Sequence, residues 1–131
     1  MKGSVRTQLR CELASLLGEK FTIGTVKSGR YYNARDGQPF VLIYFSEGQA
    51  ETESLAGISE SQLLVDINLP EGKYDDDDLD TWGDELASVI NNDMDINMDD
   101  QLAGIIYQGF EYPPLGEIPF ISLNLIYTVH S

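Results

Sequence analysis

The chain has 131 residues, a net charge of −14 and 42% hydrophobic residues, which excludes a disordered acidic tail and predicts a single domain over residues 1–131. A single cysteine, Cys11, excludes an internal disulfide framework, so nothing indicates an oxidising compartment. The strongest apolar run, Phe40 to Phe45, is too short to cross a bilayer, and the first residues do not form a signal-peptide pattern, so we expect a cytosolic protein without membrane contact.

The first predicted element is a helix. Apolar residues recur at steps of three and four from Val5 to Leu17, which is typical of one helix face, and Gly18 is expected to end the helix. The following residues, Phe21 to Val26, alternate weakly between apolar and polar and predict a strand.

The middle of the chain predicts two more strands separated by loops. Residues 27–38 are expected to form a loop or hairpin, and Phe40 to Phe45 is apolar on both faces, as in a central strand. Residues 46–60 are acidic and poorly periodic, which predicts either a long loop or a loose hairpin extension. Leu63 to Leu69 alternates as a half-buried strand does.

The last part predicts a helix and two strands. Asp75 to Asp78 are suited to a helix start, and apolar residues at helical spacing follow from Leu79 to Ile90. Leu102 to Tyr107 and Phe120 to Val129 are predicted strands, and Gly109 to Pro119, with three prolines, is predicted to be a turn or edge connection. The order of elements predicts an α+β fold with a single mixed or largely antiparallel sheet of about five strands and two α-helices on one face.

Charge is divided along the chain. Residues 1–35 hold seven of the eight basic side chains and two acids, a net charge of +5, whereas residues 36–131 hold 20 acids and Lys73, a net charge of −19. Opposite patches on one subunit favour head-to-tail self-association, which closes into rings. The simpler alternative is an acidic protein whose charge keeps it soluble.

One stretch combines basic and aromatic side chains, which suits a surface that contacts either phosphate or another subunit. The candidate contact residues are Lys27, Arg30, Tyr31, Tyr32 and Arg35. The alternative is a hairpin with ordinary cross-strand tyrosines.

Catalytic and metal-binding patterns do not emerge. Asp93, Asp95 and Asn97 match the first ligand positions of a calcium loop, but Met98 replaces its glycine and Gly104 its bidentate glutamate. We therefore assign no catalytic, cofactor-binding or metal-ligating residue and do not expect an enzyme. A small metal-dependent hydrolase is left as an alternative.

The net charge disfavours specific DNA binding, because neutralising phosphates dominates such affinity. An acidic inhibitor that mimics DNA and binds a nucleic-acid enzyme fits the charge better. Half of the 22 acids lie within residues 75–100, which is a modest argument against mimicry, because mimicry needs carboxylates spread over one face.

An ordered series of short segments resembles the phage tail terminator proteins, the family of the phage lambda minor tail protein U. The segments are the N-terminal helix with Arg6, Leu9 and Leu13, then Gly29-Arg30, Pro39 to Tyr44, Leu64 to Pro70, Leu79-Asp80 with Trp82, Gly109 to Tyr112, and Leu123 to Tyr127. The chain departs from the family in its loops at 46–60 and 113–119.

The resemblance implies a two-helix, single-sheet α+β fold and a structural role without catalytic residues. Such proteins form a hexameric ring that caps the head-proximal end of the tail tube, stops tube polymerisation and provides the head-joining surface. The implied partners are other copies of the chain, the tail tube protein and a head-completion protein. The implied locations are the host bacterial cytoplasm during assembly and the virion tail, for a phage or a prophage. A weak dependence of assembly on Mg²⁺ is expected where the ion bridges acidic subunits.

Overall fold

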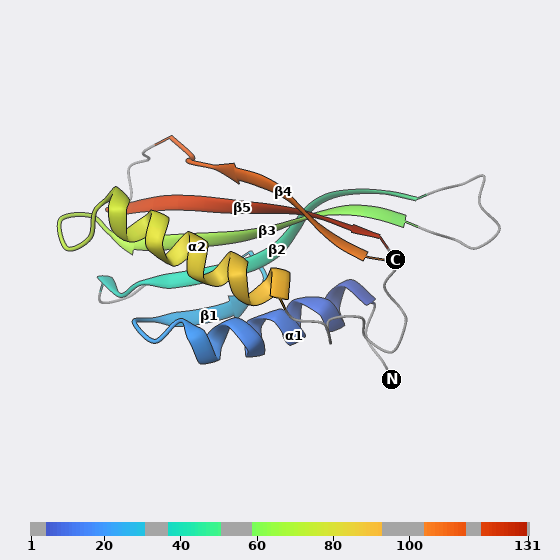
Figure 1. Ribbon diagram of the computed structural model, residues 1–131, viewed down its shortest axis with the longest axis horizontal. Coiled ribbons are helices and arrows are strands. Elements are labelled where there is room, and N and C mark those ends of the chain that lie inside the picture. Colours follow the sequence, from blue (N-terminus) through green and yellow to red (C-terminus); the bar gives the residue numbers. More distant parts are fainter. Residues whose placement is uncertain (1–4, 31–36, 51–58, 93–103, 115–118, 131) are drawn as a thin grey trace.

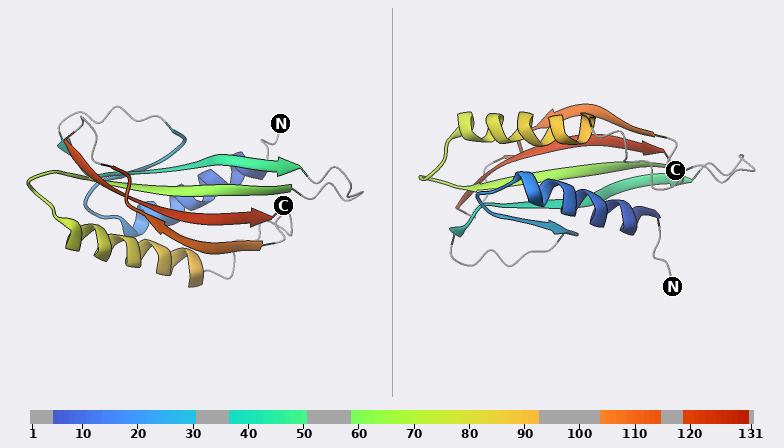
Figure 2. Two further views of the ribbon diagram at one scale, coloured as in Figure 1. Left: turned by 90° about the horizontal axis from the view of Figure 1, so that it is seen from above. Right: turned by 60° about the horizontal axis from the view of Figure 1, so that its bottom comes forward.

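The fold is a five-stranded mixed sheet with two helices packed on one face, which confirms the predicted α+β class (Figures 1 and 2). The computed structural model describes residues 5–30, 37–50, 59–92, 104–114 and 119–130. The elements are α1 (Val5–Lys20), β1 (Thr25–Ser28), β2 (Phe40–Ala50), β3 (Ser59–Pro70), α2 (Asp76–Asn92), β4 (Gly104–Glu111) and β5 (Phe120–His130). The strand order is β1-β2-β3-β5-β4, with β1 parallel to β2 and every other pair antiparallel.

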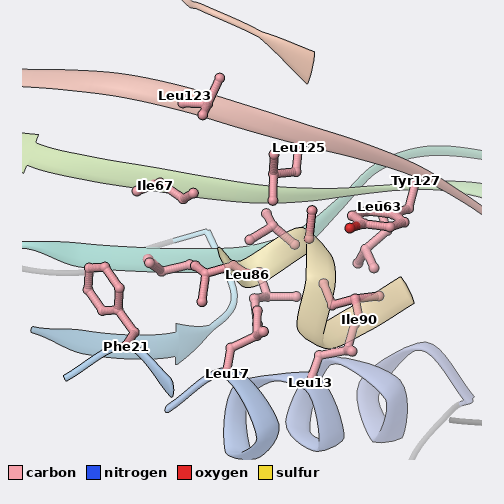
Figure 3. Packing of buried hydrophobic residues seen from close by; sticks show 14 of the residues in the cluster. Leu13, Leu17, Phe21, Leu63, Ile67, Leu86, Ile90, Leu123, Leu125 and Tyr127 are labelled. Carbon is pink, nitrogen blue, oxygen red and sulfur yellow. The ribbon is translucent and has the colours of Figure 1, made fainter. Parts of the chain in front are cut away.

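The main core lies between the helices and the sheet (Figure 3). Alternation along β3 and β5 places one set of apolar side chains on the helix face, as the sequence pattern predicts. The helices contribute residues at helical spacing, including Leu13 and Leu17 of α1 and Leu86 and Ile90 of α2, and all four are buried. Tyr127 of β5 is fully buried in the same cluster.

The first helix is longer than the sequence predicts. Gly18 lies inside α1, which ends at Lys20, so the prediction that Gly18 ends the helix is wrong. The backbone there stays helical, and the N–H of Phe21 still donates to the Leu17 carbonyl at 2.8 Å. Phe21 is then buried with its ring against Trp82 of α2, the ring centroids 4.9 Å apart, so packing between the helices carries α1 past the glycine.

The first strand begins later than predicted. Residues 21–24 form a turn, and β1 spans Thr25–Ser28, so only the end of the predicted strand is confirmed. Phe21 packs in the core between the helices and the sheet, so the alternation of apolar and polar residues at that point does not indicate a strand. Gly24 sits against the Pro39 carbonyl, which accepts a hydrogen bond from the Thr25 N–H at 3.2 Å.

Residues 46–50 and 59–60 form a hairpin extension, which confirms that alternative and excludes the long loop for these positions. Glu47 to Ala50 pair with Ser59 to Gln62 after a register shift between Phe45 and Glu47. The ends of β2 and β3 project past the helices (Figure 1). Residues 51–58, the rest of the predicted segment, lie outside the described residues.

The start of α2 confirms the predicted role of the aspartates. The Asp75 N–H donates to the Asp78 carboxylate at 2.9 Å, and the Asp78 N–H donates to the Asp75 carboxylate at 3.1 Å. This reciprocal arrangement satisfies two amides at the helix start, as a capping box does, and negative charge is favoured there. Asp76, Asp77 and Asp78 occupy the first turn, so α2 begins within the predicted run of aspartates.

The sheet face away from the helices carries a smaller apolar cluster beside the polar residues Asp66 and Asn68. Phe40, Leu42 and Phe120 are buried there, with the rings of Phe40 and Phe120 5.2 Å apart. Asp66 lies beside this cluster, paired across the sheet with Leu42. Burial raises the pKa of the Asp66 carboxyl, and a hydrogen bond from Asn68 offsets part of that rise.

Candidate functional site

Three arginines from two elements gather at the β1 edge of the sheet. Arg6 and Arg10 lie one helical turn apart on α1, and Arg30 follows β1. Together they line a cavity of about 350 Å³. We call this cavity the arginine pocket; its lining residues are Arg6, Thr7, Arg10, Gly29, Arg30, Tyr44 and Phe45.

Hydrogen bonds to neutral groups hold two of these side chains in place. The Arg10 guanidinium donates to the Ser28 hydroxyl at 3.1 Å and to the Thr7 hydroxyl at 3.4 Å. The Arg30 guanidinium donates to the Phe45 carbonyl at 3.3 Å. These partners orient the arginines without neutralising them, so their positive charge is available to an external anionic group.

Within the part of the chain that the structure describes, no carboxylate forms an ion pair with the three arginines. The ion pair found there joins Lys20 of α1 to Glu85 of α2 at 2.9 Å. The pocket also influences its neighbour Tyr44. Burial and the charge of Asp66 raise the pKa of the Tyr44 hydroxyl, whereas Arg30 lowers it. Arg30 therefore lies close enough to Tyr44 for its positive charge to favour ionisation of that hydroxyl.

The opposite edge of the sheet, at β4, exposes aromatic side chains. Tyr107, Phe110 and Tyr112 have 38%, 60% and 46% of their surface exposed. They lie beside α2 and, with Gly83, Leu123 and Leu125 beneath them, border a hollow of about 80 Å³. We call these three residues the aromatic strip.

A bulge in β4 brings the strip to one face. In a regular strand Tyr107 and Phe110 are three residues apart and point to opposite faces. The register shifts between Tyr107 and Gly109, so that Tyr107 pairs with Tyr127 and Phe110 pairs with Leu125, both on the helix face. Gly109 has a φ of 138°, which other residues rarely adopt. The predicted turn at Gly109 to Pro119 is therefore wrong for 109–111, which belong to β4.

A row of carboxylates on α2 flanks the aromatic strip. Asp76, Asp80 and Asp84 recur every four residues and are exposed. The Tyr112 hydroxyl donates to the Asp80 carboxylate. This hydrogen bond, burial, and the charges of Asp80, Asp76 and Asp84 raise the pKa of Tyr112 to about 12. We call these three aspartates the acidic row; their negative charges add to the effects of the hydrogen bond and of burial in opposing ionisation of the tyrosine.

The structure separates two of the predicted contact residues, Arg30 and Lys27. Arg30 belongs to the arginine pocket. Lys27 is exposed on β1 and pairs with Leu42, which lies on the face away from the helices, so it is separate from the pocket. Tyr31, Tyr32 and Arg35 lie outside the described residues, as do residues 93–103 of the tested calcium loop.

Sequence reasoning missed most of both surfaces. Arg6 and Arg10 lie four residues apart on the predicted N-terminal helix, and this spacing was the available signal. Tyr107 and Phe110 gave no periodic signal because of the bulge.

The described residues contain no group of three or more histidine, cysteine, aspartate or glutamate side chains arranged to hold a metal ion. Neither of the two helices described is long and apolar enough to cross a membrane. No protein-family model matches the chain, and a comparison with curated proteins finds no match.

Proposed function

We propose that this protein is a structural tail protein of a phage or prophage, which caps the head-proximal end of the tail tube as a ring, stops tube polymerisation and provides the head-joining surface. The observation that carries the proposal is the opposite charge of the two sheet edges, the arginine pocket at β1 and the acidic row at β4. A subunit with two different, complementary edges joins head to tail, and such contacts close into rings when the rotation allows.

Two further features support this proposal. The two-helix, single-sheet fold is the one that the resemblance to tail terminator proteins implies. The aromatic strip is exposed on the monomer, and exposed aromatic residues are typical of interface centres. In this role the protein acts through its surfaces and not as an enzyme.

The proposed partners are five other copies in a homo-hexamer, the tail tube protein and a head-completion protein. Assembly takes place in the host bacterial cytoplasm, and the ring remains in the virion tail. The large acidic surface disfavours specific contact with the passing DNA. Mg²⁺ has at most a supporting effect by bridging carboxylates between subunits.

A tube-polymerisation assay tests the function. The tail tube protein from the same phage or prophage is polymerised with increasing amounts of this protein, and tube lengths are measured by electron microscopy. We expect shorter tubes, each with a ring at one end, at substoichiometric amounts of this protein. Tubes of unchanged length with no bound protein would refute the proposal.

The acidic row favours a second candidate, an inhibitor that mimics DNA. Asp76, Asp80 and Asp84 form a regularly spaced line of exposed carboxylates, as a mimic requires. Such a protein would form a stoichiometric complex with a nuclease or another DNA-binding enzyme, and DNA would compete for that complex. The tube assay would then show no effect.

A further inference from the structure

We infer that the arginine pocket of one copy binds the acidic row and aromatic strip of a second copy. This inference rests on the proposed function, because a ring needs two different contact surfaces on each subunit. It goes beyond that function by naming the two surfaces and the residues that pair.

Charge complementarity is the first argument. The arginine pocket carries three guanidinium groups. Among the described residues, the guanidinium groups of Arg10 and Arg30 donate hydrogen bonds to neutral groups only. The acidic row carries three carboxylates, and among the described residues none of them pairs with a base. Each surface therefore has unneutralised charge of the sign that the other requires.

The spacing of the charges also matches. Arg6 and Arg10 are four residues apart on α1, and Asp80 and Asp84 are four residues apart on α2. Four residues of helix advance by about 6 Å, so the two pairs are separated by the same distance along their helices. Two α-helices lying side by side can therefore bring one arginine to each aspartate at the same time, and guanidinium and carboxylate groups form strong paired hydrogen bonds.

The aromatic strip adds apolar area to this contact. Phe110 and Tyr112 stand beside the acidic row, and Phe110 is 60% exposed. The face of an aromatic ring also attracts a guanidinium group. Burying the strip under the aliphatic parts of arginine side chains removes exposed aromatic surface from water while it strengthens the charge pairs.

The positions of the two surfaces make the contact directional. The arginine pocket lies at the β1 edge and the aromatic strip at the β4 edge, and these strands are the two ends of the sheet order. A copy that binds through one edge leaves its other edge open to the next copy. This geometry produces a closed ring or an open chain and not a two-fold dimer.

Charge reversal with restoration tests the pairing. One variant carries Arg6→Glu and Arg10→Glu, a second carries Asp80→Arg and Asp84→Arg, and a third carries all four changes. Self-association is measured by sedimentation velocity at low salt, and circular dichroism confirms that each variant is folded. We expect each two-residue variant to associate about 100-fold more weakly than the wild type, because like charges then face each other. The four-residue variant should recover most of the lost affinity.

Matched controls change charge away from both surfaces. Lys73→Glu and Glu71→Lys alter exposed residues of the turn between β3 and α2 and should leave association unchanged. Equal association of the wild type and both two-residue variants would overturn the inference. A wild type that remains monomeric at millimolar concentration in low salt would also overturn it.

The tube assay separates this inference from the proposed function. If the protein caps tubes and both two-residue variants cap them equally well, the function stands and the pairing is wrong. If restoration succeeds and tubes are never capped, the pairing stands and the function is wrong.

Discussion

Removing one hydroxyl from the core should stabilise this protein. Tyr127 is fully buried between the sheet and the helices (Figure 3), and its hydroxyl oxygen has no hydrogen-bond partner among the residues that the structure describes. Burial raises the pKa of this hydroxyl, with a smaller contribution from Tyr107, so it is neutral at every ordinary pH. An unpaired polar atom in the core costs free energy that an apolar replacement of the same shape does not.

The expected gain follows from the cost of that unpaired hydroxyl. Leaving a buried donor or acceptor unsatisfied costs roughly 1–3 kcal/mol, so Tyr127→Phe should raise the free energy of unfolding by about 1–2 kcal/mol, after a small loss of packing around the missing oxygen. For a domain of this length the melting temperature should rise by about 3–8 °C. Urea unfolding followed by circular dichroism measures the free energy, and differential scanning calorimetry measures the melting temperature.

The adjacent tyrosine gives a matched control. Tyr107 lies with its ring 5.1 Å from that of Tyr127, but 38% of its surface is exposed, whereas Tyr127 is fully buried. Tyr107→Phe should change the free energy of unfolding by less than about 0.5 kcal/mol. A loss of stability in Tyr127→Phe beyond that margin would refute the reasoning, because it would mean that the buried hydroxyl is paired.

Three more substitutions test other parts of the fold. Asp66→Asn should raise the free energy of unfolding by about 1 kcal/mol at pH 7, because burial disfavours the ionised carboxyl. Since the folded state holds this proton more tightly than the unfolded chain, the difference from wild type should shrink as the pH falls and vanish below the ordinary pKa of 3.8; a constant difference in acid unfolding curves would contradict this. Gly24→Ala should cost about 2 kcal/mol in urea unfolding, because the added Cβ would lie 1.9 Å from the Pro39 carbonyl oxygen. Gly18→Ala, in open space on α1, should instead stabilise by up to about 1 kcal/mol, and equal effects of the two alanines would refute the steric argument.

Sequence periodicity predicted the elements that face one core. Burial alternates from Leu63 to Ile67 in β3 and from Ile121 to Val129 in β5 because helices cover one side of each strand, and the sequence alone shows this pattern. The predicted elements are wrong where an apolar residue packs against a distant part of the chain and not within a regular strand. Phe21 suggested a strand but packs against Trp82 of the other helix, and no local pattern reports such a partner.

The candidate surfaces could be predicted only in part, because each is assembled from several elements. The sequence drew attention to residues 27–35, where basic and aromatic side chains are contiguous. The fold instead joins Arg30 to Arg6 and Arg10 of the helix, a neighbourhood that depends on how α1 lies along β1. The aromatic strip depends on a one-residue shift at Gly109, and a strict alternation would have divided it between two faces.

The division of charge along the chain becomes a division across the sheet because the strand order nearly follows the chain order. The basic first third forms α1 and β1 at one edge, and the acidic α2 and β4 form the other edge. Within the described residues one ion pair, Lys20 with Glu85, joins the two halves, and both side chains are about half exposed, at 48% and 47%. Such a pair contributes roughly 0–1 kcal/mol, so the fold owes little to attraction between the halves. The separated charges are therefore available for contacts between subunits, and salt should weaken assembly far more than it weakens the folded monomer.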